Sequence, residues 1–246
     1  MCEDGTRPLV AGVDGCPGDW IAVMREIGPD FSPRFALFRQ FTDLLALSPA
    51  PAIFAIDMPI GLAERSGPGE RGPESCACPH LGERQSPVFS VPTRAAVMCE
   101  DYREACTAAL ATSEPPRKVS KQAFNLFPKI REIDALMTPE LEVHVFEVHP
   151  ELGFWRLNGE RPMSLPKMIR SQGSIPGIEE RRTLLERFGF PADFWHQPPP
   201  SGVGADDLVD AAVNSIIAKR ILKGEAQSFP PEPERDAGGL RMAIWA

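Results

Sequence analysis

The sequence predicts an α/β fold in which helices cover a mixed β-sheet. Three strand candidates follow one another at residues 8–14, 19–27 and 34–40, so the chain opens as a three-stranded meander. Helix and strand candidates then alternate, and residues 205–223 form the clearest helix, with apolar side chains repeating at the helical period. A meander followed by alternating helices and strands is typical of a mixed sheet with helices on its faces.

The first strand candidate (PLVAGVD) is an apolar run that ends in Asp14, and the Gly and Pro residues at 15–18 indicate a turn. After the meander, residues 41–47 predict a helix that Thr42 or Asp43 can cap.

Two more strand candidates complete a five-stranded sheet. Residues 52–58 are a continuous apolar run, which is typical of a central strand covered on both faces. Residues 141–149 alternate between polar and apolar, as a strand does, and 177–188 predict a charged amphipathic helix. Gly224 ends the long helix at 205–223. All 246 residues are expected to form a single domain.

An insertion at residues 62–137 is expected after the fourth strand. Its first part, 62–92, is rich in Gly, Pro, Ser and charge and indicates a long functional loop. Residues 93–112 and 119–137 predict helices, the second with a kink or break at Pro128. The insertion is therefore expected to be a loop followed by helices, packed as a cap over the end of the sheet where Asp14 and Asp57 lie, with basic residues presented toward that end.

The composition indicates an ordinary soluble protein. Apolar residues make up 43% of the chain, which is enough to bury a core, while the net charge of −8 disfavours non-specific coating of nucleic acid. No apolar run approaches 18 residues and no secretory signal is recognisable, so we expect a cytoplasmic protein with no membrane span and mostly reduced cysteines. Cys76 and Cys78 with His80 give only a weak zinc signal, because no second pair follows at the usual spacing.

Carboxylates at the ends of predicted strands and on the last helix are the candidate catalytic and metal-binding residues. They are Asp14, Asp57, Glu147, Asp207 and Asp210. The carboxyl ends of strands in α/β sheets usually border the ligand crevice, and residues spaced i, i+3 share one face of a helix. The alternatives are turn formation by Asp14, a cap at Asp57, a solvent-facing Glu147, and an acid-rich helix start for the last pair.

Carboxylates gathered in one cleft without paired basic residues would repel each other. A bound Mg²⁺ or Mn²⁺ removes that repulsion, since hard cations prefer oxygen ligands. Two such ions can also promote phosphodiester cleavage. The sequence therefore predicts a divalent metal site.

Basic residues that could bind substrate are Lys121 and Arg131, from a segment at 115–131 that carries five basic residues and no acid. Such a local excess can hold phosphates, although a solvated helix face explains it equally well. Arg94 and His149 are further single-residue candidates for substrate binding, and His149 could instead be structural.

Several motifs together resemble one family. They are GVDGCPGDWIAV, AIDMPIGL, SKQAFNLFPKIREID, FEVHPE, DDLVDA and GLRMAIW. The chain resembles the domain of unknown function 429 family, whose members are described as predicted RNase-H-like nucleases related to the RuvC and YqgF groups. The resemblance runs from about residue 8 onward and implies an RNase-H-like mixed five-stranded sheet flanked by helices.

The resemblance also implies roles for single residues. Asp14 matches the aspartate of the first strand and Asp57 the acid of the fourth strand. Asp207 and Asp210 match the acidic pair on the last helix, and Glu147 belongs to the family's own EVHPE motif.

A metal-dependent nuclease or phosphoesterase is the leading functional hypothesis, with a nucleic acid or a phosphorylated small molecule as partner. The first alternative is a phosphotransferase of the actin and sugar-kinase type, with the turn at 15–18 holding a phosphate. That fold needs a duplicated half, which is not recognisable here. The second alternative is a non-catalytic binder of a phosphorylated ligand. Nothing in the sequence indicates an oligomeric state.

Overall fold

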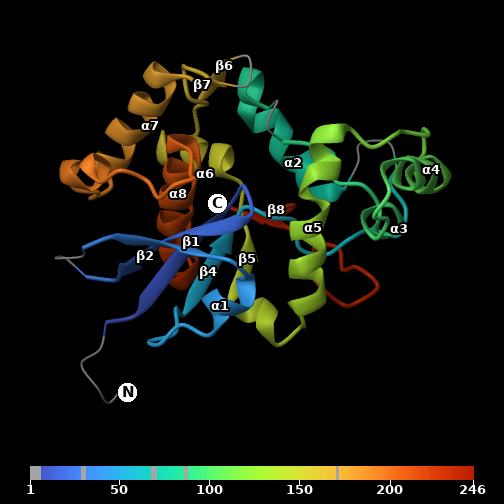
Figure 1. Cartoon of the computed structure of the whole chain (residues 1–246), viewed down its shortest axis with the longest axis horizontal. Helices are drawn as coiled ribbons and strands as arrows, with labels where there is room; N and C mark the ends of the chain where they lie inside the picture. The colour runs from blue at the N-terminus through green and yellow to red at the C-terminus, as the bar shows by residue number, and fades with distance from the viewer. Residues whose placement is uncertain (1–6, 29–31, 68–70, 86–87, 170–171) are drawn as a thin grey trace.

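The computed structural model describes residues 7–28, 32–67, 71–85, 88–169 and 172–246. Its centre is a five-stranded sheet in the order β3-β2-β1-β4-β5 (Figure 1). The strands are β1 (Leu9–Cys16), β2 (Asp19–Glu26), β3 (Arg34–Phe38), β4 (Ile53–Ile56) and β5 (Val145–Glu147). β1, β2 and β3 pair antiparallel, whereas β1, β4 and β5 are parallel. The predicted α/β fold with a mixed five-stranded sheet is confirmed, and the strand order is consistent with an RNase-H-like fold.

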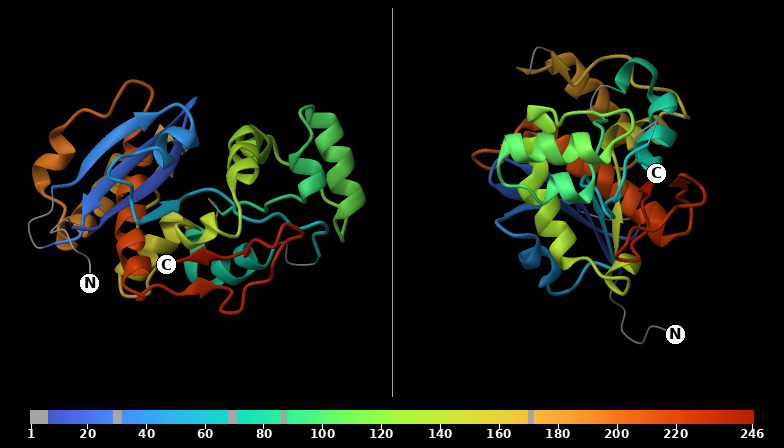
Figure 2. Two further views of the ribbon diagram at one scale, coloured as in Figure 1. Left: turned by 90° about the horizontal axis from the view of Figure 1, so that it is seen from below. Right: turned by 90° about the vertical axis from the view of Figure 1, so that its right-hand side faces the viewer.

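Helices cover both faces of this sheet. One face packs against α8 (Ala205–Leu222), which contacts β1, β2 and β4 and is itself covered by α6 (Pro150–Leu157) and α7 (Ile175–Arg187). The other face packs against α1 (Phe41–Leu45) and α5 (Lys121–Leu136). The remaining helices are α2 (Gly72–Leu81), α3 (Arg94–Val97) and α4 (Tyr102–Thr112). α3 and α4 lie beyond α5 on the side away from the sheet (Figure 2).

The side chains on the two faces of β1 and β2 belong to two separate apolar layers. Val13 and Trp20 are buried with Phe127 and Ile130 of α5, on the face of the sheet that α1 and α5 cover and that we call the insertion side. On the opposite side Ile21 is buried with residues of α8 such as Val213. Successive side chains of a strand point to opposite faces, so each strand contributes to both layers.

The structure corrects several predicted boundaries. Residues 62–92 were expected to be a loop but contain α2, whose Pro73 suits the first turn of a helix. The helix expected at 93–112 is divided, because Asp101 caps a new helix by accepting hydrogen bonds from the amides of the next turn. Pro128 lies inside α5 without ending it, because the neighbouring side chains of α5 are anchored in the core.

The strand expected at 141–149 is shorter than predicted, since it begins as a 3-10 turn at Leu141–Val143. Two small antiparallel sheets of two strands each, and α6, were not predicted at all. One sheet pairs β6 (Met168–Ile169) with β7 (Gln172–Gly173), and the other pairs β8 (Ser228–Phe229) with β9 (Ile244–Trp245). No helix in the described part of the chain is long and apolar enough to cross a membrane.

Candidate metal centre

Asp14 and Asp57 lie side by side because of the register between β1 and β4. Val13 pairs with Ile56 in the parallel ladder, and both side chains are buried on the insertion side. Asp14 follows Val13 on β1, and Asp57 directly follows β4 with its amide donating to the carbonyl oxygen of Val13, so both side chains point to the opposite face, which α8 covers. That alternation turns both aspartates toward α8 at the carboxyl ends of the two strands.

A close approach of α8 to β1 brings Asp210 to the same place. A β-carbon on Gly12 would lie 2.0 Å from the amide nitrogen of Ser215 and 2.3 Å from the carbonyl oxygen of Ala211. Only glycine allows the helix backbone to sit so near the strand. Asp210, immediately before Ala211, consequently lies beside the end of β1.

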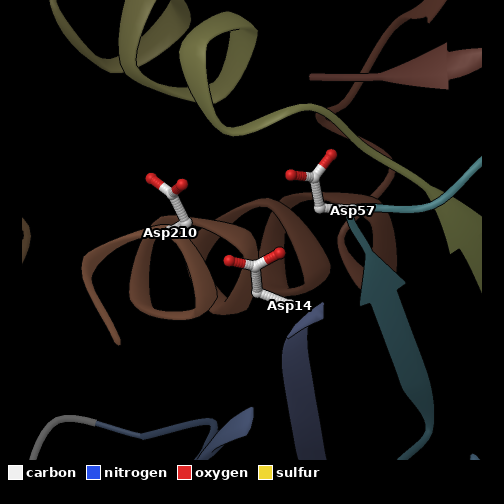
Figure 3. Close-up of side chains that lie close together, drawn as sticks. All are labelled: Asp14, Asp57 and Asp210. Carbon is white, nitrogen blue, oxygen red and sulfur yellow. The ribbon is translucent and has the colours of Figure 1, made fainter. Parts of the chain in front are cut away.

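The three carboxylates face a common space (Figure 3). One oxygen each from Asp14, Asp57 and Asp210 lies within 4.8 Å of the others. Asp14 and Asp210 are buried and Asp57 is half-buried. The expectation that these residues converge at one end of the sheet is confirmed. Oxygens at this separation can share one cation.

The pKa of all three carboxyl groups is raised, mainly by burial. The pKa of Asp57 is raised to about 8, with a further contribution from the charge of Asp210, and that of Asp210 is raised to about 6 against the opposing charge of Lys167. The pKa of Asp14 is raised by burial and then by the charges of Asp57 and Asp210. Burial destabilises the charged form of these carboxyl groups, and a bound cation would stabilise that form.

One oxygen of Asp210 is already paired and the other is not. Lys167 Nζ donates to Oδ2 of Asp210 and forms a salt bridge with it. The buried Oδ1 has no hydrogen-bond partner among the described residues. A buried carboxylate oxygen without a donor is costly, so Oδ1 is the atom of this group best suited to a cation.

The carboxylates border a cleft of about 860 Å³. Its wall on the side of the insertion includes Phe89, Gln122 and Asn125, and its wall on the side of α8 includes Lys167 and Asp207. A cleft of this size suits a small molecule or a short segment of a polymer.

Glu147 does not join the three aspartates, contrary to the sequence prediction. It pairs in register with Ile56, not with Asp57, and therefore faces the insertion side of the sheet. Its carboxylate forms a salt bridge with Arg71 and accepts a hydrogen bond from the amide of Ile60 at 2.8 Å. Burial raises the pKa of Glu147 to about 7 even though Arg71 opposes that shift.

Asp207 lines the cleft but is also outside the group of three. Its carboxylate accepts a hydrogen bond from the amide of Gly204 at 2.8 Å and so caps the start of α8. The acid-rich helix start considered from the sequence explains this residue. Its placement one turn before Asp210 leaves it at the edge of the proposed cation site.

The predicted substrate-binding residues are scattered. His149 lines the cleft, whereas Arg94, Lys121 and Arg131 do not. Arg131 donates to the carbonyl oxygens of Val97 and Cys99.

Arg94 forms salt bridges with Asp134 at 2.6 Å and with Asp236 at 2.9 Å. Lys129, from the same basic segment as Lys121 and Arg131, reaches the β1–β2 turn and donates to the carbonyl oxygen of Asp19 at 2.6 Å.

Three residues that line the cleft were not predicted from the sequence, namely Lys167, Glu151 and Arg181. Lys167 lies in a short segment with no periodic pattern, and its pairing with Asp210 spans 43 positions. Glu151 could have been noticed as the acid two residues after His149 in FEVHPE.

The weak zinc signal finds no support in the structure. The ring of His80 packs at 4.8 Å from that of Trp155 and at 5.3 Å from that of Phe229. The cluster of metal-ligating side chains in the described ranges is the aspartate group, and it contains neither Cys76 nor His80. Cys76 is a thiol outside any disulfide.

Fold and site together define an α/β protein with a buried carboxylate centre at the end of a mixed sheet. A family model described as "Protein of unknown function (DUF429)" matches residues 12–235, and the chain belongs to that family. Comparison with curated proteins and comparison with solved structures each gave no match.

Proposed function

We propose that this protein is a divalent-cation-dependent phosphoesterase that cleaves phosphodiester bonds, with Mg²⁺ or Mn²⁺ held by Asp14, Asp57 and Asp210. The observation that supports it is the convergence of three carboxylates, one oxygen from each within 4.8 Å of the others. They come from β1, from the residue after β4, and from α8. Structural ion pairs alone do not account for three acids beside a single lysine.

The donor set suits a hard cation. All three ligands are carboxylate oxygens, which Mg²⁺ and Mn²⁺ prefer, whereas zinc sites favour nitrogen and sulfur. The buried Oδ1 of Asp210 lacks a hydrogen-bond donor among the described residues, and a cation would satisfy it.

When bound, the cation supplies the positive charge that polarises a phosphoryl oxygen and makes water a better nucleophile. In the hydrolysis that we propose, the water oxygen forms a bond to phosphorus as the ester P–O bond breaks. The water proton leaves to solvent, and the departing oxygen is protonated. His149 lies in the cleft wall and is the candidate to contact that oxygen.

The charge of the cleft favours a substrate with few phosphates. Its lining includes six acidic side chains and three basic ones, and the whole chain carries a net charge of −8. A long duplex brings a dense row of phosphates, which such a surface repels. We therefore favour a nucleotide, a short single strand or another small phosphodiester over extended double-stranded nucleic acid.

The test is hydrolysis of bis(p-nitrophenyl) phosphate and of short single-stranded DNA and RNA with Mg²⁺, Mn²⁺ or EDTA. We expect cation-dependent cleavage that Asp57→Asn and Asp210→Asn reduce by about 10²-fold or more, since loss of a residue that only supports a metal ligand already costs about 10–100-fold. Asp193→Asn, which changes an exposed aspartate, is the matched control. Equal activity of parent and Asp210→Asn, or cleavage that persists in EDTA, would contradict the proposal.

A further inference from the structure

Lys167 brings a positive charge into the cleft from outside the carboxylate group. Its side chain is 15% exposed, and its ammonium forms a salt bridge with Oδ2 of Asp210. The Asp210 carboxylate that it contacts stabilises the charged form of the amine.

The segment that carries Lys167 is fixed by α7. The Glu180 carboxylate accepts hydrogen bonds from the amides of Ser164 at 3.0 Å and Leu165 at 2.9 Å. Arg181 donates to the carbonyl oxygen of Leu165 at 3.0 Å. These contacts define the path of the chain immediately before Lys167.

Two further contacts support the same segment. A β-carbon on Gly177 would lie 2.0 Å from the carbonyl oxygen of Pro166, so glycine is needed for the helix to approach. Arg181 is itself held by a buried salt bridge to Glu151 at 2.7 Å, with side chains 0% and 2% exposed. A lysine that only neutralised Asp210 could do so from a flexible segment, whereas the backbone before Lys167 is held by Glu180, Arg181 and Gly177.

Asp210 is placed to connect Lys167 with a cation. Its Oδ2 contacts Lys167, while its buried Oδ1 has no hydrogen-bond donor among the described residues. If a cation binds Oδ1, one carboxylate holds the cation and the ammonium next to each other. Two adjacent positive charges can contact two oxygens of the same phosphoryl group.

We propose that Lys167 is a catalytic residue that contacts a non-bridging phosphoryl oxygen of the substrate, beside the cation on Asp210. Arg181 and Gly177 are positioning residues, because they act on the segment that presents Lys167. This inference rests on the proposed function, since it requires a phosphoryl group at the carboxylate centre. Lys167 thereby takes the role that the sequence suggested for Lys121 and Arg131.

The competing explanation is that Lys167 only neutralises Asp210. The two explanations differ once a cation is bound. A counter-ion becomes dispensable when Mn²⁺ supplies the charge, so its removal would leave phosphate binding intact. A phosphate ligand remains necessary at saturating Mn²⁺.

The test measures two kinds of binding in the parent, Lys167→Met and Lys167→Gln. Calorimetry gives the affinity for Mn²⁺, and broadening of the ³¹P resonance of inorganic phosphate by bound Mn²⁺ gives the affinity for phosphate. We expect both variants to bind Mn²⁺ at least as tightly as the parent. Their phosphate affinity should fall about tenfold or more, the effect of losing a hydrogen bond to a charged group. Lys223→Met, at the other end of α8, should match the parent.

The outcomes distinguish failure of the proposed function from failure of the role assigned to Lys167. If the parent does not bind Mn²⁺, the proposed function and this inference both fail. If the parent and both variants bind Mn²⁺ and phosphate equally well, or the Mn²⁺-loaded parent does not bind phosphate, the inference alone fails.

Gly177→Ala tests positioning without removing the ammonium. It should weaken phosphate binding and raise KM while Mn²⁺ affinity stays unchanged, because the added methyl group displaces Pro166. Gly173→Ala, where a β-carbon meets nothing within 4 Å, is its control. Phosphate affinity and KM equal to those of the parent in Gly177→Ala would remove the positioning role.

Discussion

Gly12 lies so close to Ser215 that a β-carbon on the strand would sit 2.0 Å from the amide nitrogen of the helix. The nearest atoms are backbone atoms, which cannot move aside as a flexible side chain would. Gly12→Ala must therefore push α8 away from β1. We expect a loss of about 1–3 kcal/mol in the free energy of unfolding, typical of overpacking, measured by urea denaturation.

The same displacement should separate Asp210 from Asp14. The rise in melting temperature on adding Mn²⁺ should therefore be smaller in Gly12→Ala than in the parent. Gly173→Ala provides the comparison, since its β-carbon meets open space. An unchanged Mn²⁺ effect in a destabilised Gly12→Ala would show that cation binding does not depend on this approach.

Asp14→Asn should reduce cation binding without reducing stability in the absence of cation. Asp14 is repelled by Asp57 and Asp210, so neutralising it relieves like-charge repulsion. In EDTA at pH 8.5, above the pKa of about 8 of Asp57, the variant should melt at the same temperature as the parent or higher, and Mn²⁺ should raise its melting temperature less. An ordinary turn aspartate predicts the reverse, with lower stability in EDTA and an unchanged Mn²⁺ effect.

Stability in EDTA should fall as the pH rises from about 4 to about 8. The pKa of Asp57 is raised to about 8 in the folded protein, against about 3.9 when unfolded. Between these values the native state binds the extra proton, so a rise in pH favours unfolding. Melts at pH 5.5 and 8.5 should show a smaller drop for Asp57→Asn than for the parent or Asp193→Asn. Equal drops in all three would refute the link to Asp57.

Added Mn²⁺ should oppose this trend, because a cation binds the deprotonated carboxylates and its affinity therefore increases with pH.

Glu147→Gln should affect stability but not cation binding. Glu147 is 4% exposed and is one of two buried carboxylates bonded to Arg71, so the change removes one charged partner of the guanidinium and leaves Glu74 as the other. Because Glu74 remains, we expect a loss in the free energy of unfolding below the roughly 3–5 kcal/mol that breaking a buried ion pair typically costs. Calorimetry should nevertheless give the parent's Mn²⁺ affinity. A large loss of Mn²⁺ binding at retained fold would instead restore Glu147 as a ligand.

The sequence was sufficient to predict the sheet and to name Asp14, Asp57 and Asp210 among the candidate ligands. Asp14 and Asp57 each follow an apolar run, and the carboxyl ends of parallel strands meet at one edge. Glu147 has the same local pattern but the opposite orientation. The face toward which its side chain points depends on the register between β5 and β4, in which Glu147 lies opposite Ile56. No local sequence pattern encodes a register between distant segments.

The basic residues could not be assigned for a similar reason. Lys121 and Arg131 were chosen because they belong to a segment rich in basic residues, yet neither lines the cleft. Lys167 is isolated in sequence, and its place is set by contacts with α7 and Asp210. The choice between Asp207 and Asp210 likewise depended on whether the first acid was already used as a cap.

The carboxylate centre exists only when the two ends of the chain have met. Asn214, one turn beyond Asp210, donates to the carbonyl oxygen of Val13 across 201 positions. Contacts of such long range form late, because closing a large loop costs entropy before the contact stabilises anything. A cation therefore has little to bind on a partly folded chain. It should slow unfolding of the native protein while leaving the refolding rate nearly unchanged, in contrast to metals that organise a short local loop.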